Sequence, residues 1–127
     1  MAVQLNHTIV YASDKEASAS FLANVLGLGS PTPFGPFMAV ETANDVTLDF
    51  LHTEGEIAGQ HYAFLVSEAE FDEIFERIRD RGLDYWADPG HRRPGQINTN
   101  DGGRGVYFND PDGHNLEIIT RPYGSGP

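Results

Sequence analysis

The sequence contains no cysteine among its 127 residues. This absence excludes disulfide bonds, a thiolate nucleophile and metal sites built from sulfur ligands. Basic residues are also scarce, with 8 Lys and Arg against 19 Asp and Glu, which gives a formal net charge of −11. Such a charge argues against nucleic acid or an anionic membrane as the partner, because both are negatively charged themselves.

Long apolar runs are missing as well. No stretch approaches the roughly 18 apolar residues of a membrane-spanning helix, and residues 1–6 have neither the basic nor the apolar region of a signal peptide. We therefore expect a soluble, cytoplasmic protein whose residues 1–127 form one domain. Residues 122–127 carry the composition of a frayed tail.

Hydrophobic periodicity predicts the same order of elements twice. Each half begins with a strand, continues with a helix that opens at an S-x-x-E capping box, and ends with further strands. The first half covers about residues 4–54 and has its capping box at Ser13, and the second covers about residues 58–121 with its capping box at Ser67. The repeat predicts an α+β fold of two tandem βαβββ modules, which form a curved mixed sheet around a metal cleft with the helices on the outer face.

Polar residues occupy matched positions in the two halves. His7 and His61 each stand six residues before the serine of a capping box, and an acid follows leucine in the last strand of each half, Asp49 and Glu117. Because side chains alternate along a strand, all four residues fall on the face that the helices leave free. A carboxylate in an apolar strand costs several kcal/mol unless it has a partner.

Two imidazoles and a carboxylate from separate strands form the ligand set that Fe(II), Mn(II) or Zn(II) takes in proteins. A histidine in a strand is more often an ordinary residue that bonds to a neighbour. The repeated position favours the metal instead, and we predict the ligands to be His7, His61 and Glu117. Asp49 is either a fourth ligand or a general base, and we favour the base because Asp is one methylene shorter than Glu.

A long polar loop, Pro89 to Arg104, separates two strands of the second half. A loop of this length in a small domain indicates a lid or a binding loop, and the alternative is an ordinary solvated loop. It carries Arg92 and Arg93 in an otherwise acidic chain, and also His91, which we predict as an acid or base that reaches over the cleft.

The repeated strand histidine, together with the closing motif D-P-D-G-H-x-L-E-I at residues 110–118, resembles the vicinal oxygen chelate superfamily. That superfamily includes glyoxalase I, extradiol dioxygenases, fosfomycin-resistance thiol transferases and bleomycin-resistance proteins. The resemblance covers about residues 4–121 and implies metal ligands at His7, His61 and Glu117. It also implies a homodimer, often with each site built from modules of two chains. Glyoxalase I usually has Glu where this chain has Asp49, so its four-ligand site does not carry over directly.

Within the superfamily, four stretches of the chain resemble the ChaP-like group of oxygenases from chartreusin biosynthesis: residues 5–10, 60–66, 86–89 and 100–108. This resemblance implies Fe(II)-dependent oxidative cleavage of a C–C bond in an aromatic polyketide by dioxygen, followed by lactone formation. A flat substrate would then contact five residues: Tyr11, Trp86, Arg92, Arg93 and Tyr107. The alternatives are an antibiotic-sequestering protein without catalysis, and a glyoxalase-like isomerase or thiol transferase that prefers Ni(II), Zn(II) or Mn(II).

Overall fold

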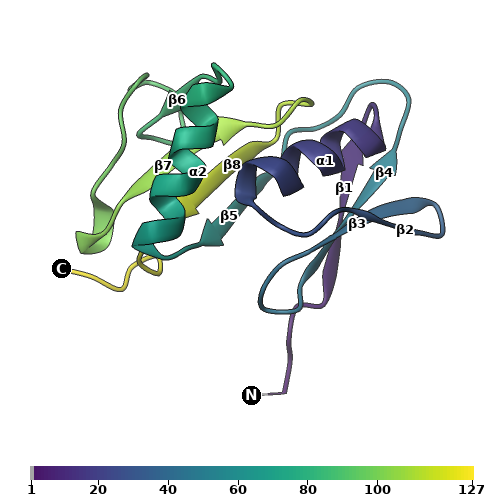
Figure 1. Cartoon of the computed structure of the whole chain (residues 1–127), viewed down its shortest axis with the longest axis horizontal. Coiled ribbons are helices and arrows are strands. Elements are labelled where there is room, and N and C mark those ends of the chain that lie inside the picture. The colour runs from purple at the N-terminus through teal and green to yellow at the C-terminus, as the bar shows by residue number, and fades with distance from the viewer. Residues whose placement is uncertain (1) are drawn as a thin grey trace. The chain divides into compact units, whose positions relative to one another are not determined.

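The computed structural model describes residues 2–127, which form two compact units that divide between Ala58 and Gly59. In each unit one helix lies against one face of a four-stranded sheet (Figure 1). None of the helices within residues 2–127 is both long and apolar enough to cross a membrane.

Unit 1 contains the first helix and four strands. Strand order in its sheet is β1-β4-β3-β2, with β1 and β4 parallel and the other pairs antiparallel. The elements are β1 (His7–Ala12), α1 (Lys15–Leu26), β2 (Thr32–Phe34), β3 (Phe37–Glu41) and β4 (Thr47–His52).

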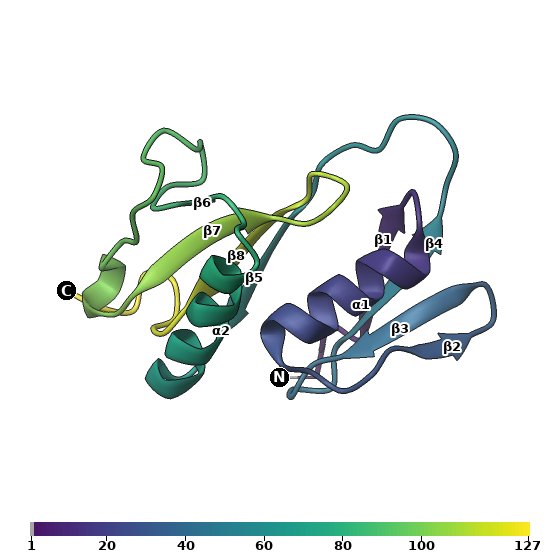
Figure 2. The ribbon, with the colours of Figure 1, turned by 45° about the horizontal axis from the view of Figure 1, so that its top comes forward.

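Unit 2 repeats this topology. Its strand order is β5-β8-β7-β6, again with the first pair parallel and the others antiparallel, and Figure 2 shows β5, β8 and β7 running across the unit. The elements are β5 (His61–Leu65), α2 (Glu68–Asp80), β6 (Tyr85–Trp86), the one-turn 3-10 helix η1 (Asn100–Gly102), β7 (Gly105–Asn109) and β8 (Asn115–Ile119). The predicted α+β fold of two βαβββ modules is confirmed, and a cleft formed by the two sheets stays a prediction.

The second helix begins and ends as its sequence predicts. The Ser67 side chain accepts a hydrogen bond from the Glu70 N–H while the Glu70 carboxylate accepts one from the Ser67 N–H, which completes the capping box. Beyond its last turn, Gly82 adopts a φ of +67°, a left-handed conformation that glycine reaches without a steric penalty. Phe71 and Ile78, on one side of the helix, are fully buried.

The start of the first helix differs from the prediction. The N-cap is Asp14, whose carboxylate accepts a hydrogen bond from the Ala17 N–H, and the capping box expected at Ser13 is wrong. Both residue types cap helices well, so two adjacent candidates compete. The backbone of Ser13 is instead hydrogen-bonded to His52, which leaves Asp14 to satisfy the helix terminus.

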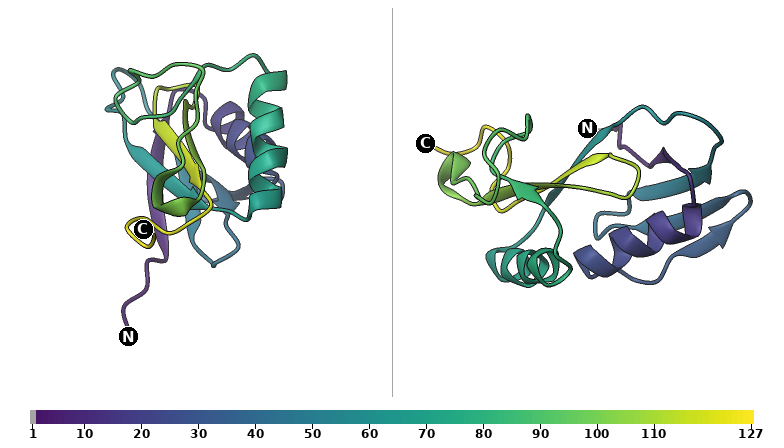
Figure 3. Two further views of the ribbon diagram at one scale, coloured as in Figure 1. Left: turned by 90° about the vertical axis from the view of Figure 1, so that its left-hand side faces the viewer. Right: turned by 90° about the horizontal axis from the view of Figure 1, so that it is seen from above.

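Burial alternates along the strands and defines two faces in each sheet. In unit 1, Val10, Leu48 and Phe50 are buried on the side that α1 covers, whereas Ile9 and Tyr11 are exposed. In unit 2 the strands bury Val106, Phe108, Leu116 and Ile118 on the side of the helix, and Figure 3 shows α2 on one side of its sheet. Tyr107, on the other face, is buried as well. The predicted site residues of the strands therefore lie on the face opposite the helix.

Two short elements lie where the sequence predicts only connecting segments. Strand β2 falls within the Pro-rich connector of unit 1 and pairs with β3 at the edge of the sheet. An edge strand tolerates Pro33 because only one of its sides needs to donate hydrogen bonds. In the long loop of unit 2, η1 lies between Asn98 and Gly105, whose backbones pair with each other.

Candidate metal and substrate site

His61 and Glu117 form the centre of the candidate site in unit 2. Strands β5 and β8 run parallel, with His61 opposite Asn115, two residues before Glu117. The His61 Nδ1–H donates to the backbone oxygen of Asn115 at 2.9 Å, and His61 Nε2 lies 3.2 Å from Glu117 Oε1. The bond to the carbonyl places the ring proton on Nδ1, so the Nε2 lone pair faces the carboxylate.

This geometry fits a shared divalent ion. Two atoms that each bind one ion at about 2.1 Å, at a right angle, lie about 3 Å apart. The 3.2 Å between His61 Nε2 and Glu117 Oε1 is close to that separation. Without a cation the two groups attract each other only if His61 carries a second proton. The Glu117 side chain is 12% exposed and the His61 side chain 48%, so the pair is open on the imidazole side.

Tyr107 on β7 supports Glu117 from the other side. The two residues are opposite each other in the register of β7 and β8, and the tyrosine hydroxyl donates a hydrogen bond to the Glu117 carboxylate. Burial is the main reason why the pKa of Tyr107 is well above its usual value, and the bond to Glu117 and its negative charge raise the pKa further. The Tyr107 ring also stacks on His61, with centroids 5.9 Å apart. Tyr107 therefore stays a neutral donor that holds the carboxylate in place.

Trp86 and His91 form a flat stack beside this group. Their rings are 3.7 Å apart at an angle of 4°, and Trp86 is paired with Tyr107 across β6 and β7. His91 has a φ of +58°, and its Nε2–H donates to Asn115 Oδ1 at 3.0 Å. The Asn115 amide in turn donates to Pro89 O at 3.2 Å. His91 is thus held by the same asparagine that orients His61, with Nδ1 as the nitrogen that can accept a proton.

The first part of the long loop is fixed by one carboxylate. Asp88 accepts hydrogen bonds from the backbone N–H groups of Arg92 and Arg93 at 2.9 and 2.8 Å. Backbone bonds from Ala87 to Arg93 and from Gly95 to Tyr85 tie the loop to the end of β6. Both arginine side chains are exposed.

Unit 1 supplies His7 and Asp49. The His7 Nδ1–H donates to Asn6 Oδ1 at 2.7 Å, so His7 also keeps its lone pair on Nε2. Asp49 lies between Ile9 and Ala39 in the sheet and is only 6% exposed. Its Oδ1 has no hydrogen-bond partner among residues 2–127. Tyr11 lies further along β1 on the face of His7 and is 48% exposed.

The structure brings some of the predicted residues together and leaves others separate. It joins His61, Glu117 and Tyr107 in one cluster, and it joins His91 to Trp86. In the part of the chain that the structure describes, no three His, Asp or Glu side chains gather closely enough to hold a metal ion. The three-ligand set with His7 and the catalytic roles stay predictions.

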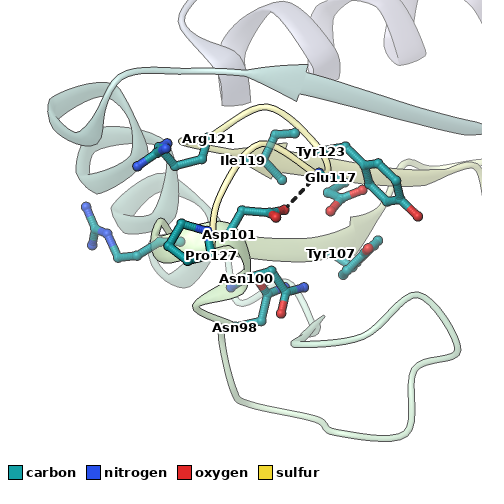
Figure 4. Close-up of a pocket in the computed structure, with 11 residues that line it drawn as sticks. Asn98, Asn100, Asp101, Tyr107, Glu117, Ile119, Arg121, Tyr123 and Pro127 are labelled. Atoms are coloured by element: carbon teal, nitrogen blue, oxygen red, sulfur yellow. Dashed lines mark hydrogen bonds between the residues drawn. The ribbon is translucent and has the colours of Figure 1, made fainter.

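A pocket of about 440 Å³ opens beside Glu117 and Tyr107 in unit 2 (Figure 4). Sequence reasoning missed most of its lining, which includes Asn98, Asn100, Asp101, Ile119 and Tyr123. The N-D-G-G run at residues 100–103 is a turn signal and could have indicated a fixed loop there. No local signal connects Tyr123 with the pocket.

The fold and this strand site define a class of protein. The chain belongs to the Glyoxalase/Bleomycin resistance protein/Dioxygenase superfamily, whose family model matches residues 4–118. The resemblance found in the sequence is therefore confirmed.

Two solved structures share most of the sequence. Oxidase ChaP-H1 is 72% identical, with 97% of this chain and 99% of that chain covered and a TM-score of 0.95. Oxidase ChaP-H2 is 68% identical over 100% of both chains, with a TM-score of 0.97. These likenesses confirm the resemblance to the ChaP-like group and support an enzyme.

Curated relatives are more distant. Metallothiol transferase FosB of Shouchella clausii is 31% identical over 91% of this chain and 79% of its own length. Glutathione transferase FosA of Serratia marcescens is 30% identical over 93% of this chain and 81% of its own length.

Proposed function

We propose that the protein is a non-haem, Fe(II)-dependent dioxygenase that cleaves a C–C bond of an aromatic polyketide in natural-product biosynthesis, with lactone formation. The observation that carries this proposal is the likeness to two oxidases at 68% and 72% identity over essentially the whole chain. The facing His61 and Glu117 side chains supply a place for the metal.

The proposed ligands are His7, His61 and Glu117, with Mn(II), Zn(II) or Ni(II) as alternative ions. Both histidines have their Nδ1–H engaged by a carbonyl oxygen, which leaves Nε2 as the donor nitrogen. We propose a homodimer in which the His7 of one chain completes the site of the other. A bound Fe(II) would acidify a phenolic hydroxyl and provide the redox chemistry that dioxygen requires.

The remaining steps fall to the protein's own side chains. Asp49 is proposed to accept the proton of the substrate hydroxyl, because its buried Oδ1 is free to receive one. Tyr107 holds the Glu117 carboxylate in place with its hydroxyl. His91, through its Nδ1, is proposed to move a second proton, which lactone formation requires.

Aromatic surfaces near the pair suit a flat substrate. The stacked rings of Trp86 and His91 form a rigid shelf next to Tyr107, and Tyr11 adds an exposed ring in unit 1. Arg92 and Arg93 are exposed on the loop that carries this shelf and are proposed to attract acidic phenols or quinone oxygens. The proposed partners are therefore a small aromatic substrate and dioxygen, with no nucleic acid and no membrane.

The test is anaerobic reconstitution with Fe(II), followed by an oxygen-uptake screen with polycyclic phenols and mass spectrometry of the products under ¹⁸O₂. We expect oxygen uptake that depends on Fe(II) and on the phenol, with labelled oxygen in a ring-cleaved product. An antibiotic-sequestering protein would instead bind the phenol without oxygen uptake, and the His7→Ala variant would bind it as tightly as the wild type.

A thiol transferase is the second candidate, because FosB and FosA are 30–31% identical over more than 90% of this chain. It predicts Mn(II)- or Zn(II)-dependent addition of a thiol to fosfomycin and no oxygen uptake. Assay of both reactions with the same metal-loaded sample separates the two candidates.

A further inference from the structure

The segment Pro122–Pro127 is fixed to the loop of unit 2. The Asp101 carboxylate accepts hydrogen bonds from two backbone groups of this segment, the Gly124 N–H at 3.1 Å and the Gly126 N–H at 3.3 Å. A further bond, from Ser125 N–H to Pro122 O at 3.0 Å, makes the segment a turn. These bonds differ from the frayed tail that the sequence suggests.

Close packing makes this attachment specific. A Cβ atom built at Gly126 would collide with the backbone carbonyl of Asp101, so only glycine allows the approach. Asp101 itself has a φ of +59°, which Asp adopts more readily than most residues. Its loop is held at Gly103, where an added Cβ would press on the side chains of Thr120 and Arg121. The carboxylate therefore sits on a fixed loop.

The fixed segment forms one wall of the Glu117 pocket. Tyr123, Gly124 and Pro127 line the pocket together with residues of β7 and β8, among them Tyr107 and Glu117. Figure 4 shows the Tyr123 ring on the side of the pocket where Glu117 and Tyr107 lie. Tyr123 is 96% exposed, an unusual state for a large aromatic side chain, and a flat ligand in the pocket would cover it.

We propose that residues 122–127 are a substrate-binding wall, that Asp101 is the positioning residue that holds it, and that Tyr123 is a specificity-determining residue that contacts the outer ring of a polycyclic phenol. A pocket of about 440 Å³ has the size of sites for drug-sized ligands, which suits fused rings better than a single ring. This inference rests on the proposed function for the class of its ligand.

The test is calorimetric binding of two probes, 1,4-dihydroxyanthraquinone and catechol, to the metal-free protein of residues 1–127. We expect Tyr123→Ala to weaken binding of the three-ring probe about five- to tenfold, the usual effect of a lost aromatic contact, and that of catechol less than twofold. Tyr123→Phe keeps the ring and should bind both probes within twofold of the wild type.

The wall itself is tested by Asp101→Ala and Gly126→Ala, which release the segment. Each should weaken binding of the three-ring probe about tenfold and that of catechol little. Gly29→Ala is the matched control, because nothing lies within 4 Å of a Cβ at Gly29. A merely structural role would reduce the affinity for both probes equally, and thermal melting reports any loss of folding. If Asp101→Ala or Gly126→Ala unfolds, the comparison of Tyr123→Ala with Tyr123→Phe tests the proposal.

Equal losses for the two probes, no loss in Tyr123→Ala, or no binding of the three-ring probe to the wild type would each overturn the proposal. The measurement needs neither metal nor turnover. Failure of Fe(II)-dependent oxygen uptake therefore refutes the proposed function and leaves a positive binding series standing, whereas a negative binding series with intact oxygen uptake refutes only the wall.

Discussion

The two units present a histidine and an acid in the same register but with different outcomes. His7 lies opposite Thr47, two residues before Asp49, as His61 lies opposite Asn115, two residues before Glu117. In unit 2 the carboxylate reaches the imidazole at 3.2 Å and also binds Tyr107.

In unit 1 the carboxylate is buried and its Oδ1 has no partner among residues 2–127. The strand frame is the same, so the difference comes from one methylene and from the neighbours. Glu117 is the longer acid and lies next to an imidazole, which favours a role as metal ligand. Asp49 is shorter and buried with an unbonded oxygen, which favours a role as general base.

The largest expected effect comes from removing each acid in turn. Glu117→Ala should lower metal affinity at least 100-fold, because it deletes the only carboxylate of the proposed ligand set and leaves two neutral imidazoles. Asp49→Ala should retain metal and lose 10²- to 10⁴-fold in kcat, the usual contribution of a general base. Metal content after gel filtration and steady-state oxygen uptake measure the two effects. Loss of metal in Asp49→Ala would make Asp49 a ligand and remove the contrast.

A mixing experiment tests whether the two half-sites meet across a dimer. His7→Ala and Glu117→Ala are each expected to be inactive. In a dimer with shared sites, random exchange of the two variants restores about one quarter of the sites, because half of the dimers are mixed and each has one intact site. Sites built within one chain would give no recovery. The readout is oxygen uptake after subunit exchange, with each variant alone as control.

The buried carboxylate of Asp49 should also affect the stability of the protein. Replacement of the buried Asp49 carboxylate by a neutral amide, Asp49→Asn, should raise the free energy of unfolding by about 1 kcal/mol while it abolishes turnover. Asp45→Asn in the preceding turn, where the residue is exposed, should change it by less than about 0.5 kcal/mol. Urea unfolding of the metal-free proteins measures both. A less stable Asp49→Asn would show that the carboxylate has a partner in solution.

The smallest expected effect concerns Tyr107. Its pKa is raised in the folded state, whereas the same group in the unfolded chain ionises near pH 10. Above pH 10 the unfolded state therefore binds fewer protons than the folded state, and the free energy of unfolding must fall as the pH rises.

Tyr107→Phe should flatten this fall by less than about 1 kcal/mol between pH 10 and 11. Tyr11→Phe serves as the control, because Tyr11 is exposed in unit 1 and is not among the groups that raise the pKa of Tyr107. Thermal melting across this pH range measures the difference, and parallel curves for Tyr107→Phe and the wild type would refute the assignment.

Local patterns were enough to predict both helices and all strands except β2, the strand faces that the helices leave uncovered, and the positions of His61 and Glu117 on one such face. Strand alternation and the repeat act over short distances, and both are visible in the residues themselves. The bonds of Asp101 to Gly124 and Gly126 are different, because they join a loop to backbone groups more than twenty residues away. Backbone N–H donors carry no sequence signal, so the segment looked free.

The other differences between prediction and structure lie at the start of the first helix, at an edge strand and at His91. Ser13 and Asp14 are equally good helix caps, and a contact of Ser13 with the distant His52 decides between them. Strand β2 contains Pro33, which usually argues against a strand, yet the end of a sheet accepts it. The contacts of His91 depend on a positive φ and on Asn115, which no spacing rule predicts.

The face-to-face contact of Trp86 with His91 also has a practical side. Trp86 is the only tryptophan of the chain, and its indole is 3.7 Å from a ring that the long loop carries. The intrinsic fluorescence of the unlabelled protein is thus a single-site optical signal. A change in emission on mixing would report either movement of the His91 loop or contact of an added ring with Trp86, in real time and without a dye.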